Sequence, residues 1–120
     1  MNYRLVEHAQ NNYVECLSGD GRIENENDAL DLVAACGEHQ IHRLLITAEN
    51  VTEDFFHLRT GLAGAVLQKF VNYSVKVAAV LTPELVNQGR FHELVLEANR
   101  SNQLFHVFYA REQAEEWLVQ

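Results

Sequence analysis

The chain has 120 residues, 48% of them hydrophobic and 22% charged, which is the balance of a folded globular domain and excludes a disordered chain. With 9 basic against 17 acidic side chains the net charge is −8, so the chain repels nucleic-acid backbones and anionic membrane surfaces. We therefore expect one domain over residues 1–120 that binds neither nucleic acid nor membranes.

The cysteines and the apolar segments indicate a cellular location. Cys16 and Cys36 belong to no CxxC pair, and two cysteines cannot form a disulfide framework, so we expect buried free thiols in a reducing compartment. No apolar run reaches 18 residues, and the first residues lack the apolar run of a signal peptide. These features predict a soluble cytoplasmic protein.

The first third of the chain predicts a hairpin and a helix. Residues 3–8 and 13–18 are strand-like and are separated by an Asn-Asn turn, while Gly19, Asp20 and Gly21 end the second strand. Asn25 or Asn27 can cap a helix whose apolar positions follow helical spacing as far as Cys36. Gly37 is placed for the left-handed residue that commonly ends a helix.

The middle of the chain predicts a buried strand and a long helix. Residues 44–46 form a continuous apolar run, typical of a strand that is buried on both faces. Thr52 is placed to cap a helix with Glu53 and Asp54 in its first turn. Apolar residues at helical spacing extend this helix to Asn72 and Tyr73. A helix of this length would measure about 30 Å.

The last third predicts two more strands and two more helices. Residues 75–81, which are apolar apart from Lys76, predict a second fully buried strand, and Thr82 followed by Pro83 indicates a cap and a short turn to Gly89. A helix then begins at Phe91 and closes in the polar residues 99–102. Residues 104–109 are the last strand, and the last helix has its apolar face at Ala114, Trp117 and Leu118. The predicted fold is α/β, with a single mixed, mostly parallel five-stranded sheet, an N-terminal hairpin and about four helices.

Two glycines inside the predicted long helix require an explanation. Gly61, Gly64 and Ala65 line one side of it, and each glycine costs about 1 kcal/mol relative to alanine in a helix interior. Close approach of another backbone would justify them, and that backbone could be the protein's own sheet, a second subunit or a ligand. The second reading predicts a homodimer that meets through Gly61, Gly64, Ala65 and Gln68.

Polar residues follow the predicted parallel strands, where open α/β sheets bind ligands. They are Glu49, Asn50, Thr52, Glu84 and Arg111, with Arg90 or His92 on the next segment. Helix caps and first-turn acids are also expected at several of these positions. Six histidines show no metal-ligand pattern, and no nucleophile, phosphate-loop or dinucleotide motif is present, so we expect neither a metal nor a cofactor.

Several segments together resemble an uncharacterised bacterial family, domain of unknown function 4180. The most specific run is TGLAGAVLQKFVNY at residues 60–73, and the likeness continues through residues 28–32, 49–56, 77–80, 97–100 and 112–118. The resemblance covers nearly the whole chain. It supports the fold and implies no established activity.

The order of elements is also similar to the STAS and anti-sigma-factor-antagonist class. In that class a phosphorylatable Ser or Thr begins a helix after a buried strand, typically in an Asp-Ser-Ser/Thr-Gly setting. The matching place here holds Thr52 without an Asp-Ser pair or a glycine, and Glu53 and Asp54 would repel an added phosphate. The resemblance therefore argues weakly for a phosphoswitch at Thr52.

Beside the phosphoswitch at Thr52, the sequence leaves two other functional hypotheses. The first is a small non-enzymatic regulatory or protein-interaction module that self-associates. The second is a small-ligand-binding protein or an enzyme, with its site at the carboxyl ends of the parallel strands.

Overall fold

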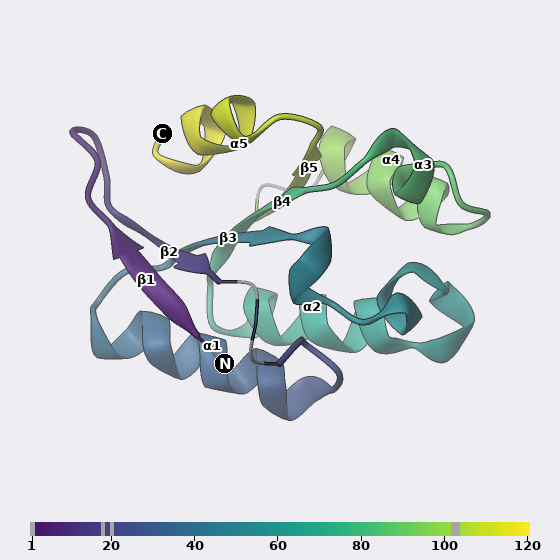
Figure 1. Ribbon diagram of the computed structural model, residues 1–120, viewed down its shortest axis with the longest axis horizontal. Helices are drawn as coiled ribbons and strands as arrows, with labels where there is room; N and C mark the ends of the chain where they lie inside the picture. The colour runs from purple at the N-terminus through teal and green to yellow at the C-terminus, as the bar shows by residue number, and fades with distance from the viewer. Residues whose placement is uncertain (1, 18, 20, 102–103) are drawn as a thin grey trace.

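The computed structural model describes residues 2–17, 19, 21–101 and 104–120 (Figure 1). One five-stranded sheet is present, in which the strands lie side by side in the order of the chain. The first two strands pair antiparallel and the others pair parallel, so the predicted mixed α/β sheet with an N-terminal hairpin is confirmed. The strands are β1 (Tyr3–Val6), β2 (Tyr13–Cys16), β3 (Arg43–Thr47), β4 (Lys76–Val80) and β5 (Phe105–Phe108).

Each predicted strand is present within two residues of its expected bounds. Residues 44–46 are buried on both faces of the sheet, as their apolar run predicts. Parts of the predictions at Ser18, Asp20 and Asn102 lie outside the described residues.

Helices and short 3-10 turns connect the strands. The helices are α1 (Glu26–Glu38), α2 (Leu62–Asn72), α3 (Pro83–Val86), α4 (Phe91–Ser101) and α5 (Arg111–Leu118). The 3-10 turns are η1 (Ala48–Asn50), η2 (Glu53–Phe56) and η3 (Leu58–Thr60). The described residues form one helix more than the four expected, because the turn expected after Thr82 is the short helix α3. The Thr82 hydroxyl accepts the N–H of Leu85 at 3.3 Å. Within the described ranges, no helix is long and apolar enough to span a bilayer.

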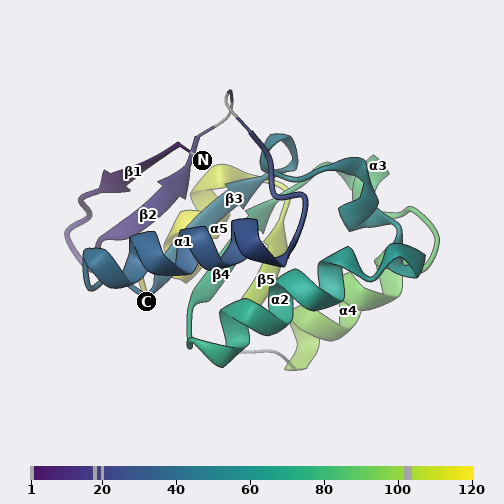
Figure 2. The ribbon, with the colours of Figure 1, turned by 90° about the horizontal axis from the view of Figure 1, so that it is seen from below.

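The helices cover the two faces of the sheet unequally. In Figure 2, α1 and α2 lie side by side in front of the sheet, and α5 lies behind it. The helix α4 packs beside β5 and contributes Phe91, Val95 and Ala98 to the same core as α1 and α2. This follows from the strand order: right-handed crossovers between successive neighbouring strands place every connecting helix on the same face. Only α5, which follows the last strand, is free to fold over the other face.

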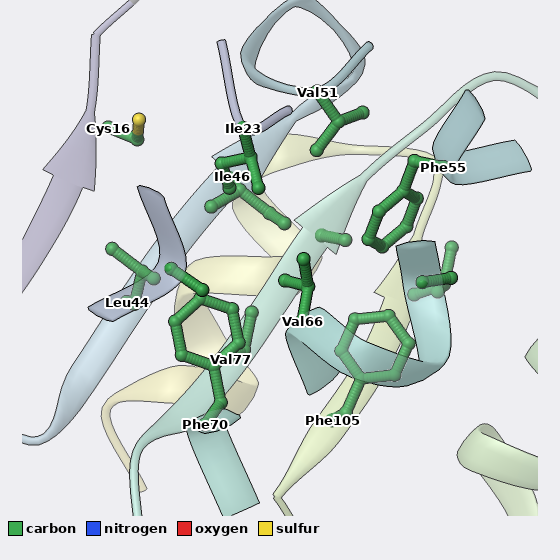
Figure 3. Close-up of a cluster of buried hydrophobic side chains, with 14 of the residues drawn as sticks. Cys16, Ile23, Leu44, Ile46, Val51, Phe55, Val66, Phe70, Val77 and Phe105 are labelled. Atoms are coloured by element: carbon green, nitrogen blue, oxygen red, sulfur yellow. The ribbon is translucent and has the colours of Figure 1, made fainter. Parts of the chain in front are cut away.

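The larger core lies between the sheet and the three connecting helices. Val66 and Phe70 of α2 point toward Val77 of β4, beside Leu44 and Phe105 of neighbouring strands (Figure 3). Both cysteines are buried free thiols in this core, as expected. Burial raises the pKa of the Cys16 thiol and of the Cys36 thiol to about 11.

The smaller core lies under α5. It contains Tyr13, Leu45, Ala78, Ala114, Leu118 and Val119. At its margin the indole of Trp117 stacks on His106 with 4.5 Å between ring centroids, and Lys76 Nζ lies 4.4 Å from the indole centroid. One eight-residue helix cannot cover five strands, so aromatic and cationic side chains complete this face.

The end of α1 differs from its prediction. The helix continues through Gly37 to Glu38, and Gly37 is not the left-handed residue. Gln40 takes that role with φ 57°. Its N–H donates to the Gly37 carbonyl at 3.1 Å, and the Ile41 N–H donates to the Cys36 carbonyl at 2.9 Å. This bonding pattern ends a helix without glycine, because the two backbone hydrogen bonds offset the cost of the left-handed side chain.

The predicted long helix from Thr52 is wrong in its first half. Residues 53–60 form the turns η2 and η3, and the α-helix begins only at Leu62. His57 is extended between the two turns, and Gly61 has φ 78°, which a right-handed helix excludes. The helix ends near Tyr73, as its apolar pattern predicts.

Of the three explanations proposed for the two glycines, close packing against the protein's own sheet is wrong. An added Cβ at Gly61 or Gly64 would meet no neighbouring atom within 4 Å, and both residues are exposed. Gly61 is instead explained by its positive φ. Gly64, Ala65 and Gln68 lie on the side of α2 that faces away from the sheet, with Ala65 partly buried.

The edge of the sheet at β5 is closed by a side chain. The Asn99 amide of α4 donates to the Val107 carbonyl at 3.2 Å, and its Oδ1 accepts the Val107 N–H at 2.8 Å. Both outward backbone groups of Val107 are therefore bonded.

The two glycines of the α2 region should respond oppositely to alanine. Gly61→Ala should lower the free energy of unfolding by about 1 to 2 kcal/mol, because a Cβ disfavours positive φ. Gly64→Ala should raise it by about 0.5 to 1 kcal/mol, because the site is helical and has free space. Urea unfolding of the two variants measures both effects, and a loss of stability in Gly64→Ala would contradict the exposed placement of that residue.

Candidate functional site

A groove of about 760 Å³ lies beyond the carboxyl ends of the central strands. One wall is residues 53–60, which follow β3, and the other is residues 88–90, which follow β4. The ribbon places both segments at the same end of the molecule, on the right in Figure 1. An adjoining hollow of about 240 Å³ shares Glu53, Phe56 and Gln88 with the groove. Ligands of open α/β sheets bind outside the carboxyl ends of the strands, and this groove is the candidate site because it lies at those ends. It differs from the usual case in that the crossovers on its two sides do not change face.

Three phenylalanines hold the two walls together. Phe55 and Phe56 come from η2, and Phe91 begins α4 and is fully buried. Phe56 lies 5.7 Å from Phe55 and 5.2 Å from Phe91 between ring centroids, both in edge-to-face geometry. Edge-to-face pairs are worth about 0.5 to 1.5 kcal/mol beyond their burial. The base of the groove is therefore a packed aromatic cluster.

The segment that enters the groove is anchored at Asn50, which is 0% exposed. Its Oδ1 accepts the Thr47 N–H at 2.7 Å, and its carbonyl accepts the Ile23 N–H at 2.7 Å. The Thr52 N–H returns a bond to the Ile23 carbonyl at 3.3 Å. Nδ2 of Asn50 is buried and has no hydrogen-bond partner among the described residues. These bonds fix the path of the chain from β3 into the groove wall.

Thr60 holds the groove wall to the start of α2. Its hydroxyl lies 2.8 Å from the Asp54 carbonyl and 2.9 Å from the His57 carbonyl, and it accepts the Leu62 N–H at 3.2 Å. The next residue, Gly61, turns the chain into α2 with its positive φ. The hydroxyl thus ties both 3-10 turns to the helix.

The groove presents apolar and charged groups together. Its apolar lining is Phe56 and the half-buried Leu58. Its charged lining comprises Glu53, Asp54, Arg59 and Arg90, and the His57 imidazole lies among them. Glu53 Oε1 lies 3.5 Å from His57 Nε2 at the surface. This arrangement can seat an apolar side chain and engage charged groups beside it.

The residues expected at the strand ends fall into two groups. Glu49, Asn50 and Thr52 lie together after β3, and Glu84 lies in α3 after β4. Glu49 and Glu84 are exposed, and none of the four lines the groove. The expectation that Thr52 caps a helix through its side chain is wrong: its hydroxyl makes no cap bond, and it lies 3.5 Å from the Ile23 carbonyl.

The segment after α3 brings one expected neighbour to the groove. Arg90 lines it, whereas His92 is half-buried in the first turn of α4 and is absent from the lining. The other groove residues were missed because the predicted helix over residues 52–73 concealed two turns. Consecutive Phe55 and Phe56 gave no warning of these turns, because helices bury adjacent positions too: Ala35 and Cys36 are both buried in α1.

Arg111 lies on the opposite face of the sheet from the groove. Its guanidinium forms an ion pair with Glu15 of β2, which Arg4 Nε also contacts at 2.6 Å. Arg111 Nη2 lies 3.5 Å from the hydroxyl of Tyr13, and that hydroxyl donates to Glu115 of α5. The network joins the hairpin to α5 where apolar packing ends.

The network changes the ionisation of its members. Burial alone would raise the pKa of Glu15, but the guanidinium groups of Arg111 and Arg4 outweigh it, and the pKa is lowered from 4.5. Burial, followed by the bond to Glu115, raises the pKa of Tyr13 to about 12. Glu15 is therefore a carboxylate at neutral pH, although it is only 7% exposed.

Comparison with known proteins gives one family. The family model described as "Domain of unknown function (DUF4180)" matches residues 8–118. The chain therefore belongs to this family, as its sequence suggested. No curated protein and no solved structure matches the chain. The likeness to the STAS class remains a prediction from the order of elements.

Removing the carboxylate of Glu15 should destabilise the fold. Glu15→Gln should lower the free energy of unfolding by roughly 1 to 3 kcal/mol at neutral pH, because two guanidinium groups lose the buried negative charge between them and one of the two acceptor oxygens becomes an NH2 donor. Glu97→Gln is the matched control, since its ion pair with Arg100 is exposed and should contribute under about 1 kcal/mol.

The pH dependence of the same pair is a second readout. The pKa of Glu15 is lowered in the folded protein, so the ionised side chain stabilises the fold fully above pH 4.5. This stabilisation falls as the pH drops below that value. The difference between the wild type and Glu15→Gln, followed by urea unfolding from pH 7 to pH 3, should shrink in the acidic range. A difference that stays constant would contradict the assigned ionisation.

Proposed function

We propose that this member of the DUF4180 family is a protein-interaction module that holds a segment of a partner protein in the groove beyond β3 and β4. The groove is the observation that carries the proposal. It combines a volume of about 760 Å³ with an opening to solvent and with lining groups of both apolar and charged character. Enclosed pockets bury most of a small ligand, whereas an open groove suits a chain segment that enters and leaves.

The construction of the walls supports the same function. The aromatic cluster, the Asn50 anchor and the Thr60 bonds fix both walls before any partner arrives. A site that is already ordered loses little conformational entropy on binding. Such a groove can select a partner by the side chains it presents.

A photo-crosslinking residue at Gln88 tests this proposal. Gln88 is exposed and lines both hollows, so p-benzoylphenylalanine there should give a discrete protein adduct in the cells that make the protein. The same residue at Gln113, which is exposed on α5 far from the groove, is the matched control and should give none. Mass spectrometry of the adduct should map one partner segment, and a second variant, Leu58→Asp, should abolish it.

Two outcomes would contradict the interaction module. One is the absence of an adduct at Gln88. The other is a small bound molecule that survives in the native mass spectrum of the purified protein and is lost in Leu58→Asp. That outcome would support the alternative hypothesis, a small-ligand-binding protein or an enzyme.

Self-association through α2 is a second proposal, supported by a separate surface. Gly64 and Gln68 are exposed one turn apart, and Val71 is 40% exposed on the next turn. Tyr73, just after the helix, is 54% exposed. A helix face with a glycine and large exposed apolar groups suits close packing against a second copy.

A bulky side chain at Gly64 tests self-association. Gly64→Trp should shift the protein from dimer to monomer, because the indole would hold the two helices apart. Gln113→Trp adds the same side chain on the exposed face of α5 and should leave the mass unchanged. Sedimentation equilibrium over a range of concentrations measures the association, and a wild type that is monomeric throughout would end the proposal.

A further inference from the structure

The exposed cations of this acidic protein are unevenly distributed. Four of the nine Lys and Arg side chains pair with carboxylates, namely Arg4, Lys69, Arg100 and Arg111. Lys76 donates to the Trp117 carbonyl at 2.8 Å, and Arg43 is half-buried. Arg22, Arg59 and Arg90 remain. All three are exposed, and within the part of the chain that the structure describes none lies in an ion pair.

These three arginines converge on the two adjoining hollows. Arg59 and Arg90 come from the opposite walls of the groove, and Arg22 lines the smaller hollow. Every exposed cation that lacks a carboxylate in the described chain is therefore at this end of the molecule. A protein with a net charge of −8 has abundant carboxylates to pair with its arginines, so their separation here leaves guanidinium groups for an external anion.

The acidic groups of the lining reduce this charge without cancelling it. The lining of the two hollows contains two carboxylates, Glu53 and Asp54, against three arginines. Glu53 is engaged by His57 at 3.5 Å. The net charge of this lining is thus positive, whereas the net charge of the whole chain is strongly negative.

The apolar groups of the groove define the rest of the ligand. Phe56 is held edge-on against Phe91 and offers a rigid surface, and Leu58 stands beside it in the lining. A free phosphate or another small anion would leave these groups uncovered. A chain segment covers them with a side chain while its neighbouring carboxylates reach the two walls, where each guanidinium can bind a carboxylate through two parallel hydrogen bonds.

We propose that the groove binds an acidic peptide segment of the partner, with carboxylates on Arg59 and Arg90 and an apolar side chain against Phe56 and Leu58. This inference rests on the proposed function, because it names the chemistry of the partner that the groove holds. It opposes the protein's net charge, which by itself would favour a basic partner.

Two fluorescein-labelled decapeptides test the inference. One alternates Glu with Leu, and the other alternates Lys with Leu. Fluorescence anisotropy at physiological salt should show tighter binding of the acidic peptide. Arg59→Glu combined with Arg90→Glu should weaken that binding by roughly tenfold or more. Glu53→Gln combined with Asp54→Asn should strengthen it, because both changes remove charges that repel the peptide.

Arg100→Glu is the matched control for charge reversal. Arg100 is exposed in the last turn of α4, at the opposite end of that helix from Arg90. Its reversal alters the net charge by the same amount per site and should leave the binding of the acidic peptide within about twofold, because surface charges at this distance are screened. Thermal unfolding of each variant confirms that the fold is retained.

The outcomes separate this inference from the proposed function. Tighter binding of the basic peptide, or acidic binding that is unchanged in the double arginine variant, overturns the inference. If the adduct at Gln88 still forms in that variant, the groove binds a partner of different chemistry and the proposed function stands. If neither peptide binds and no adduct forms, the proposed function fails as well.

Discussion

The order of the strands is the constraint from which the rest of the structure follows. Each parallel strand is the immediate neighbour of the one before it, so the crossovers of one hand carry α1, α2 and α4 to the same face. The segments that leave β3 and β4 then emerge side by side at one end of the sheet. Phe55 and Phe56 from the first segment meet Phe91 beyond the second. The groove is the space between the segments that leave these two neighbouring strands.

The same constraint explains the contrast between the two faces. The face of the connecting helices is closed mainly by apolar packing, and the buried side chains of its core come from almost every element of the chain. The other face has only α5, which packs against Tyr13 of the hairpin. Glu15, Arg4 and Arg111 complete the contact there with charges. A carboxylate in a fully buried strand is stable in this place because two guanidinium groups arrive from different elements.

The sequence was most informative where a local signal and the final structure depend on the same residues. The Asn25 cap is an example: its side chain accepts the Asp28 N–H at 3.0 Å, so the residues that form the cap lie next to one another in the sequence. The continuous apolar strands and the pattern of α2 from Leu62 onward are others. The segment before Leu62 could not be predicted, because apolar periodicity does not distinguish an α-helix from two 3-10 turns that bury adjacent aromatic rings. Gly61 was assigned to a helix interior for the same reason.

The sequence predicts the end of the sheet at which the candidate site lies, but not the side chains that line it. General rules for open sheets point to the carboxyl ends of all the parallel strands, and they decide neither which two ends form the groove nor which side chains turn toward it. Arg111 shows what sequence reasoning misses. It follows a parallel strand, as a binding residue would, yet it pairs with Glu15, which lies 96 positions earlier, and both are on the face of the sheet away from the groove. No pattern within either segment contains that pairing.

Asn99 has a consequence for how the sheet can be extended. Its amide offers Val107 one acceptor and one donor, and so imitates the backbone of an absent sixth strand. An incoming strand would have to displace this side chain before it could pair there. The sheet therefore has a built-in terminus at β5, and lateral growth by strand addition is directed to the opposite border, at β1.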